Sequence, residues 1–155
     1  MSKGLWVLPS RRRPEALKDL FAVLAATGCN TGGLILIEKN EMEKLKDIYL
    51  TLKLPDKWTW YTTDSEGYAA KCNEFVHDPI ARDLDWIGFL ADDLCPETYQ
   101  WDARLISRMN GYNVVAANDG YQAPKRMNGA IVFSRPLLDA VGYFAPPGMQ
   151  HLFDT

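Results

Sequence analysis

Trp86-Ile87-Gly88-Phe89-Leu90-Ala91-Asp92-Asp93 is the stretch of sequence that decides the fold. Up to Ala91 its residues are apolar or glycine and do not alternate with polar ones, which is typical of a strand buried on both faces in the middle of a sheet. The two adjacent carboxylates that follow repel each other unless a cation or hydrogen bonds offset the repulsion. Mg²⁺ takes one or two carboxylates together with substrate phosphates, so the pair indicates a metal site. A solvated turn before a helix is the alternative.

The composition is that of one ordinary globular domain. The chain has 155 residues, of which 47% are hydrophobic and 24% are charged. A net charge of −3 argues against a broad basic field for nucleic acid or an anionic membrane. The apolar opening, residues 5–8, is too short for a signal peptide or a membrane span. An odd number of cysteines without a C-x-x-C pair favours reduced thiols, so we expect a cytoplasmic protein (Cys29, Cys72, Cys95).

Apolar runs and helical periodicities alternate along the chain. Strands are predicted at residues 5–8, 34–37, 57–62, 86–90, 114–117 and 127–133. Helices are predicted from Pro14 to a stop at Thr27-Gly28, and at residues 41–52, 67–76, 97–109 and 136–141, with a loop at 77–85. This order predicts an α/β fold with a mostly parallel central sheet and helices on both faces.

Polar residues follow most of the predicted parallel strands. In such sheets, ligands bind outside the carboxyl ends of the strands. The residues at those ends are Pro9-Ser10-Arg11-Arg12-Arg13, Glu38, Thr62-Thr63-Asp64 and Asp92-Asp93. We therefore expect the functional site at this edge of the sheet.

The three arginines stand directly before a predicted helix. Cations are unfavourable there, because the helix dipole already presents positive partial charge. The cluster therefore indicates an anionic ligand, most naturally a phosphate, although a solvated basic turn would give the same sequence. A diphosphate held by arginines on one side and by a carboxylate-bound metal on the other would explain both clusters. The sequence contains neither a P-loop motif nor a G-x-G-x-x-G fingerprint.

These residues resemble a known family. A strand followed by Pro-Ser-Arg-x-Arg-Pro, a helix and a strand with a terminal acid resembles the opening of family-2-type glycosyltransferases of the GT-A fold. Gly67 to Asn73 is similar to that family's Gly…Asn helix, and Phe89-Leu90-Ala91-Asp92-Asp93 falls where the family carries Asp-x-Asp. Residues 127–130 (Met-Asn-Gly-Ala) and 141–144 (Val-Gly-Tyr-Phe) resemble its acceptor-side segments. The resemblance covers almost the whole chain and implies a Rossmann-like GT-A fold.

The resemblance also implies ligands and roles. The donor would be a nucleotide-diphosphate sugar, with Mn²⁺ or Mg²⁺ as cofactor and an acceptor that the sequence does not identify. Asp93 matches the metal-ligating aspartate, while Ala91 replaces the first aspartate, whose contact with ribose or metal Asp92 would take over. The nucleotide end would be lined by Pro9, Ser10, Arg11, Arg13, Glu38 and Asp64, with Lys71 on the helix over the diphosphate.

The C-terminal segment would supply the remaining chemistry. In an inverting enzyme a carboxylate base deprotonates the acceptor hydroxyl, and Asp154 is the acid available after the Val-Gly-x-Phe segment. His151 would be a third metal ligand or an acceptor contact, although a frayed tail would explain both residues. Residues 1–95 would form the donor half of a single domain and 96–155 the acceptor half. Family members continue further, so we expect a compact version or a fragment.

Two other readings of the sequence remain. A nucleotidyltransferase uses a similar sheet and metal-bound aspartates, but a glycine-rich loop would be expected where Ser10 and the arginines stand. A non-catalytic module that keeps the nucleotide pocket is the other alternative, because Ala91 replaces an aspartate.

Overall fold

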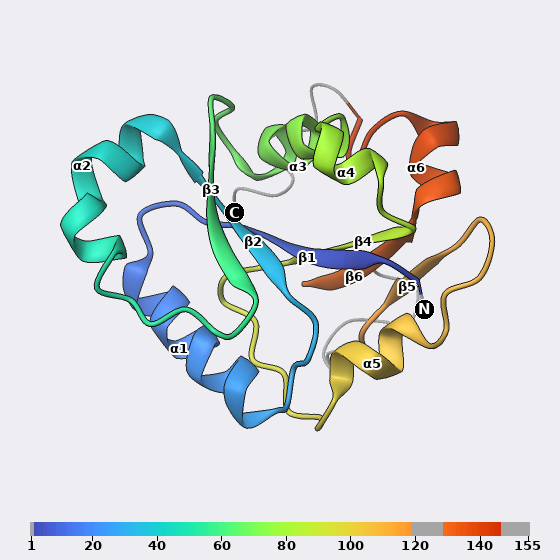
Figure 1. Ribbon diagram of the computed structural model, residues 1–155, viewed down its shortest axis with the longest axis horizontal. Helices are drawn as coiled ribbons and strands as arrows, with labels where there is room; N and C mark the ends of the chain where they lie inside the picture. Colours follow the sequence, from blue (N-terminus) through green and yellow to red (C-terminus); the bar gives the residue numbers. More distant parts are fainter. Residues whose placement is uncertain (1, 119–128, 147–155) are drawn as a thin grey trace.

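The computed structural model describes residues 2–118 and 129–146. Within this part of the chain, six strands form one mixed sheet in the order β3-β2-β1-β4-β6-β5 (Figure 1). The neighbouring strands from β3 to β4 pair in parallel, whereas β6 runs antiparallel to both β4 and β5. The strands are β1 (Gly4–Pro9), β2 (Gly33–Glu38), β3 (Trp58–Thr63), β4 (Trp86–Leu90), β5 (Val114–Ala116) and β6 (Ala130–Ser134).

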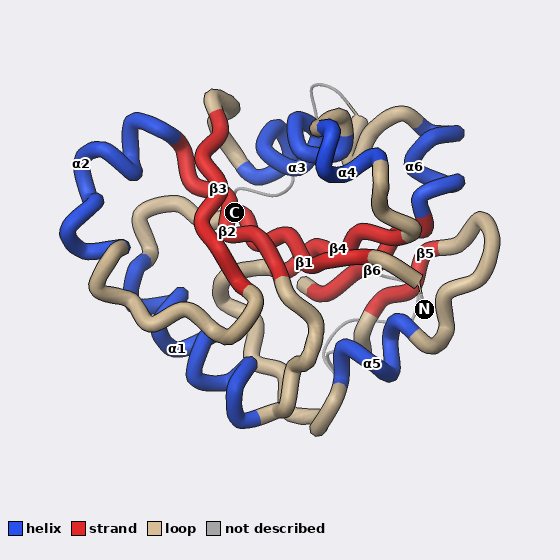
Figure 2. The backbone as a smooth tube through the Cα atoms, in the orientation of Figure 1, coloured by secondary structure: helices blue, strands red, loops and turns tan. Residues whose placement is uncertain are grey.

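Helices cover both faces of the sheet, as predicted (Figures 1 and 2). One apolar cluster includes α1 and Trp101 of α5, and the opposite cluster includes residues of α3, α4 and α6. Helix α2 follows β2 and adds Tyr49 to the first cluster. The helices are α1 (Pro14–Ala26), α2 (Lys39–Tyr49), α3 (Tyr68–Val76), α4 (Pro79–Arg82), α5 (Trp101–Ile106) and α6 (Arg135–Val141).

The stretch that contains β4 lies inside the sheet, between β1 and β6. All five residues of β4 are buried, and successive residues pack into opposite clusters: Ile87 and Phe89 face α3, whereas Trp86 and Leu90 face α1. The glycine between them has a steric reason. A Cβ at Gly88 would lie 2.2 Å from the ring of Trp6 on the neighbouring strand, so a side chain at this position would displace that ring.

Two predicted segments differ from the structure. The predicted loop 77–85 contains α4, because Asp78 accepts a hydrogen bond from the Ile80 N–H as its N-cap and Pro79 suits the first helical position. The helix predicted at 97–109 is shorter. Gln100 has a left-handed backbone (φ 52°), and its N–H donates to the Thr27 carbonyl, so the helix begins only at Trp101.

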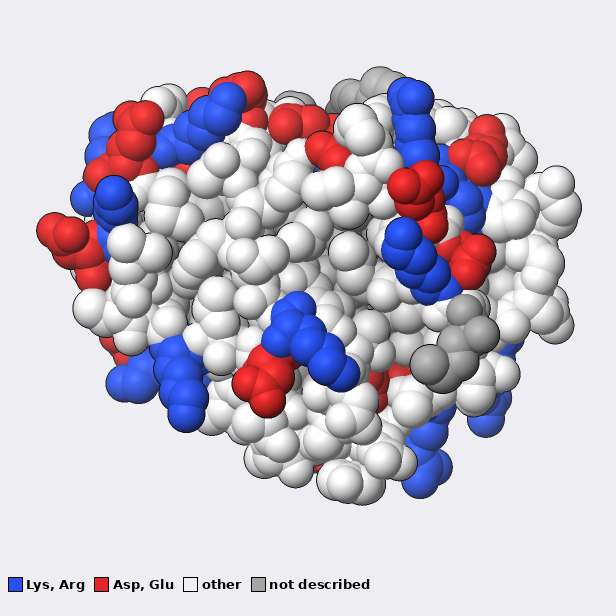
Figure 3. All heavy atoms as spheres, in the orientation of Figure 1, with Lys and Arg blue, Asp and Glu red and all other residues white. Residues whose placement is uncertain are grey.

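The parallel strands bring their carboxyl ends to one edge of the sheet. Pro9 ends β1, Glu38 ends β2, Thr63 ends β3 and Leu90 ends β4, so the polar residues that follow them gather there. On the face drawn in Figure 3, acidic and basic side chains are interspersed. No helix of the described residues is long and apolar enough to cross a membrane.

Candidate functional site

Asp92 and Asp93 follow β4 and differ in their surroundings. Asp92 is 8% exposed; its Oδ2 accepts a hydrogen bond from the Ser10 hydroxyl (2.7 Å) and its Oδ1 accepts one from Arg13 Nη1 (3.2 Å). The Asp93 side chain is 71% exposed, and its Oδ2 lies 3.7 Å from the same nitrogen of Arg13. One guanidinium group therefore contacts both adjacent carboxylates and offsets part of the repulsion between them.

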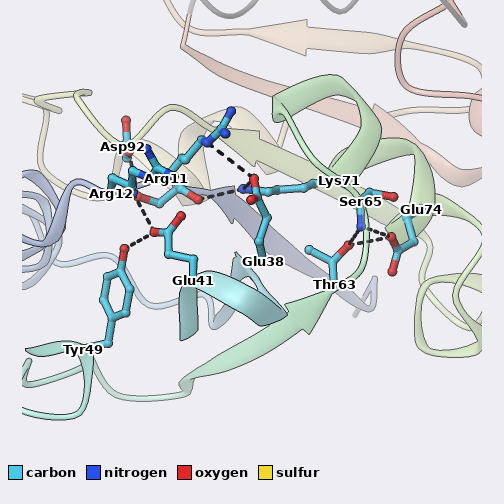
Figure 4. A network of polar contacts seen from close by, with 11 residues as sticks. Arg11, Arg12, Glu38, Glu41, Tyr49, Thr63, Ser65, Lys71, Glu74 and Asp92 are labelled. Atoms are coloured by element: carbon cyan, nitrogen blue, oxygen red, sulfur yellow. Dashed lines mark hydrogen bonds and ion pairs between the residues drawn. The ribbon is translucent and has the colours of Figure 1, made fainter. Parts of the chain in front are cut away.

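Glu38 and Lys71 form a buried ion pair beneath the loop after β1. The Lys71 side chain is 1% exposed, and its Nζ lies 3.1 Å from Glu38 Oε1 and donates to the Ser10 carbonyl (2.9 Å). Arg11 approaches the same carboxylate from outside, with 3.7 Å between Nε and Oε1 (Figure 4). Lys71 thus lies under the site and holds Ser10 and Glu38 together.

Glu41 is a fourth carboxylate of the site, and the sequence did not single it out. It is 6% exposed, and its Oε1 accepts hydrogen bonds from the Arg12 N–H (2.6 Å) and from the Tyr49 hydroxyl (Figure 4). Burial, followed by the hydrogen bond to Glu41, raises the pKa of Tyr49, which keeps this hydroxyl protonated and able to donate. Glu41 therefore joins the start of α2 to the loop that carries the arginines.

Asp64 lies apart from these contacts. It follows β3 and pairs with Lys39 at 2.8 Å, and both side chains are more than half exposed. The turn beside it is fixed by Glu74, which accepts hydrogen bonds from the Thr63 hydroxyl (2.5 Å) and the Ser65 N–H (3.1 Å). Burial tends to raise the pKa of Glu74, but the hydrogen bonds from Ser65 and Thr63 outweigh it and lower that pKa.

The structure thus brings most of the predicted nucleotide-site residues together. Direct contacts join Ser10, Arg13, Asp92 and Asp93. A second set joins Arg11 and Lys71 to Glu38, and Lys71 links the two sets by donating to the Ser10 carbonyl. Pro9 ends β1 directly before these contacts. Asp64 instead pairs with Lys39, and His151 and Asp154 lie outside the described residues.

The acidic residues fit a divalent cation that a diphosphate also binds. Among residues 2–118 and 129–146, no group of three His, Cys, Asp or Glu side chains forms a metal centre by itself. Mg²⁺ needs fewer protein ligands when substrate phosphates supply the others. Asp93 suits this arrangement, because its carboxylate is exposed and has an ion pair but no hydrogen bond from Arg13.

The sheet order and the covering helices form a Rossmann-like α/β fold of the GT-A type. Solved structures of similar fold support this architecture, but they do not identify glycosyltransferase family 2 in particular.

Two solved structures illustrate the likeness. The first is a mannosyltransferase from Pyrobaculum calidifontis in complex with GDP-mannose and Mn²⁺, with a TM-score of 0.64 and 12% identity. The match covers 93% of this chain and 48% of the mannosyltransferase, so the chain spans about half the length of that protein. The second is 4-diphosphocytidyl-2C-methyl-D-erythritol synthase from Anaerococcus prevotii, with a TM-score of 0.57, 8% identity and coverage of 98% and 81%. No family model and no curated protein matches the chain.

Proposed function

We propose that the chain is a glycosyltransferase that moves a sugar from a nucleotide-diphosphate donor to an acceptor hydroxyl, with inversion at the transferred carbon. Its donor half would be residues 1–95 and its acceptor half residues 96–155. The observation that carries the proposal is the position of Arg13 between the carboxylates of Asp92 and Asp93, at the edge where Arg11 meets Glu38. Positive groups from the loop after β1 and negative groups from the ends of β2 and β4 are thus available together.

The arginines are suited to a diphosphate. Arg11 and Arg13 are 48% and 56% exposed, so each guanidinium can turn from its carboxylate toward an incoming phosphate. Helix α1 begins just after them, and the side chain of its N-cap residue, Arg13, makes no capping hydrogen bond. The N–H groups of that first turn and the helix dipole add to the attraction for an anion.

Mn²⁺ or Mg²⁺ would be held by Asp93, with Asp92 beside it and His151 as a further ligand. The chemistry that such an ion supplies is neutralisation of the charge that develops on the departing nucleotide diphosphate. Arg11 and Arg13 would stabilise the same charge from the other side. Glu38 and Asp64 would face the nucleoside, and Lys71 would hold Ser10 and Glu38 in place beneath it. Asp154 would accept the proton of the acceptor hydroxyl.

The test is a thermal-shift screen of UDP, GDP and their sugar conjugates, each with and without Mn²⁺. We expect a rise in Tm that requires both the diphosphate and the metal, followed by release of nucleoside diphosphate when an acceptor is supplied. The absence of any diphosphate-dependent rise in Tm would reject the proposal.

Nucleotidyl transfer is the second candidate, and the likeness to a 4-diphosphocytidyl-2C-methyl-D-erythritol synthase favours it. It predicts that nucleoside triphosphates raise Tm where diphosphates do not, and that pyrophosphate is released. Donor binding without hydrolysis or transfer across a broad acceptor panel would instead identify a binding module.

A further inference from the structure

The loop that joins β1 to α1, residues 10–13, is referred to below as the arginine loop. At its centre Arg12 has a left-handed backbone, with φ 53°. A residue with a Cβ adopts this conformation at a cost, and it persists only where the surrounding structure fixes it. The contact that fixes it here is the hydrogen bond from the Arg12 N–H to Glu41 Oε1 (2.6 Å).

The surroundings of Glu41 are unusual for a carboxylate. It is 6% exposed, its Oε1 accepts from both the Arg12 N–H and the Tyr49 hydroxyl, and its buried Oε2 has no hydrogen bond from the described residues. Tyr49 is fully buried. Burial of an incompletely satisfied carboxylate is unfavourable, so folding stability alone does not account for it. Such local conflicts concentrate at functional sites.

The conformation of Arg12 decides what the two neighbouring side chains meet. With Arg12 in this conformation, Arg11 lies against Glu38 (3.7 Å) and Arg13 against Asp92 (3.2 Å). In Figure 4, Glu41 lies between Arg12 and Tyr49, whereas Glu38 lies between Arg11 and Lys71. Glu41 does not touch the exposed arginine side chains; it touches the backbone between them.

We infer that Glu41 and Tyr49 are positioning residues, which hold the arginine loop in the one conformation that presents Arg11 and Arg13 together to a diphosphate. The diphosphate part of this inference rests on the proposed function, whereas the conformational part does not. If the loop has its binding conformation for only a fraction of the time, its apparent affinity for the ligand is the intrinsic affinity multiplied by that fraction.

The arginine loop carries its own reporter. Trypsin cleaves after arginine, and the rate of cleavage at 11–12 and 12–13 follows the population of the opened loop when cleavage is slow. Cleavage after the exposed Arg108, next to the far edge of the sheet, supplies an internal reference. Tyr49→Phe is the first test variant, because it removes one donor from Glu41 and little else.

Tyr61→Phe is the matched control. Tyr61 also donates its hydroxyl to a carboxylate, that of Asp78, and burial followed by this hydrogen bond raises its pKa to about 12. The substitution therefore deletes the same kind of hydrogen bond at a distance from the arginine loop. Glu41→Ala removes the acceptor altogether, and Glu41→Gln keeps a carbonyl oxygen that can accept from both donors.

We expect both Tyr49→Phe and Glu41→Ala to raise cleavage in the arginine loop relative to cleavage after Arg108. For Glu41→Ala the expected increase is about tenfold. The affinity for UDP or GDP with Mn²⁺, measured by calorimetry, should fall by the factor by which the closed fraction of the arginine loop decreases. Tyr61→Phe and Glu41→Gln should stay within about twofold of the wild type in loop cleavage.

Unchanged cleavage in Glu41→Ala, or equal increases in Tyr49→Phe and Tyr61→Phe, would overturn the inference. Cleavage of the arginine loop as fast as in the unfolded chain, together with an unchanged diphosphate affinity, would overturn its binding part. If the wild type binds neither UDP nor GDP while Glu41→Ala still opens the loop, the proposed function fails and the conformational role of Glu41 stands.

Discussion

Replacement of Lys71 by methionine is the most direct test of the buried ion pair between Lys71 and Glu38 beneath the site. Methionine replaces the unbranched apolar stem of the side chain and removes the charged amino group, so the Glu38 carboxylate and the Ser10 carbonyl lose their contacts at 3.1 and 2.9 Å. Loss of one partner of a buried ion pair destabilises a protein by about 3–5 kcal/mol. Arg11 remains 3.7 Å from Glu38, so the lower end, about 3 kcal/mol, is expected.

For a domain of this size the loss corresponds to a fall in Tm of about 6–12 °C. Urea unfolding followed by tryptophan fluorescence measures the free energy, and Lys71→Met/Glu38→Gln completes a double-mutant cycle. Glu38→Gln removes the charge that Lys71→Met leaves unpaired. Glu38→Gln should therefore lower the free energy of unfolding far less in the Lys71→Met background than alone, with an interaction energy of at least about 1 kcal/mol.

Lys39→Met is the matched control, because Lys39 pairs with Asp64 at 2.8 Å on the surface rather than in the interior. Its Tm should stay unchanged, since exposed ion pairs contribute little. If Lys71→Met destabilises the protein no more than Lys39→Met does, or if the two changes in the cycle are additive, the reasoning about the buried pair is wrong.

Three further predictions follow from single groups. Asp93→Ala should abolish the metal-dependent part of a nucleotide thermal shift without lowering the Tm of the free protein, because its side chain is 71% exposed. With a thiol reagent at pH 8, Cys95 alone should react quickly, because it is exposed, whereas burial raises the pKa of Cys29 to about 12 and holds that of fully buried Cys72 well above its usual value. Glu74 has a lowered pKa, so it stabilises the fold above the ordinary glutamate pKa and this contribution is lost as pH falls below it; Glu74→Gln should flatten the acid limb of a Tm-against-pH curve.

The sequence predicted the strands and the edge of the site because both depend on local patterns. An unbroken apolar run such as residues 86–90 identifies a central strand, and parallel strands bring whatever follows them to one edge. Ser10, Glu38 and Asp92 are therefore found from the sequence without knowledge of any contact between them.

Glu41 could not be found in this way. In an ideal helix, Glu41 and Tyr49 would stand about 12 Å apart along the axis, so no helical periodicity pairs them. They meet in the structure, and α2 has a non-helical residue, Leu45 (φ −113°, ψ 16°), between them. Neither this interruption nor the left-handed Arg12 has a sequence signal, since both depend on tertiary contacts.

The arrangement of charges in the described structure has a consequence for binding. Arg11 and Arg13 already have carboxylate partners: Arg11 has Glu38, and Arg13 has Asp92 and Asp93. A diphosphate that engages Arg13 must take it from the two aspartates, which then repel each other unless a cation replaces the guanidinium. Under the proposed function, diphosphate and Mn²⁺ should therefore bind cooperatively, and each must tighten the other by the same factor.

Arg13→Gln should tighten Mn²⁺ binding in the absence of nucleotide and reduce this mutual factor, whereas Arg11→Gln, with the same change in charge but no contact with Asp92 or Asp93, should alter Mn²⁺ binding less. Titration of Mn²⁺ with and without UDP or GDP measures both effects, and equal responses of the two variants would contradict the argument.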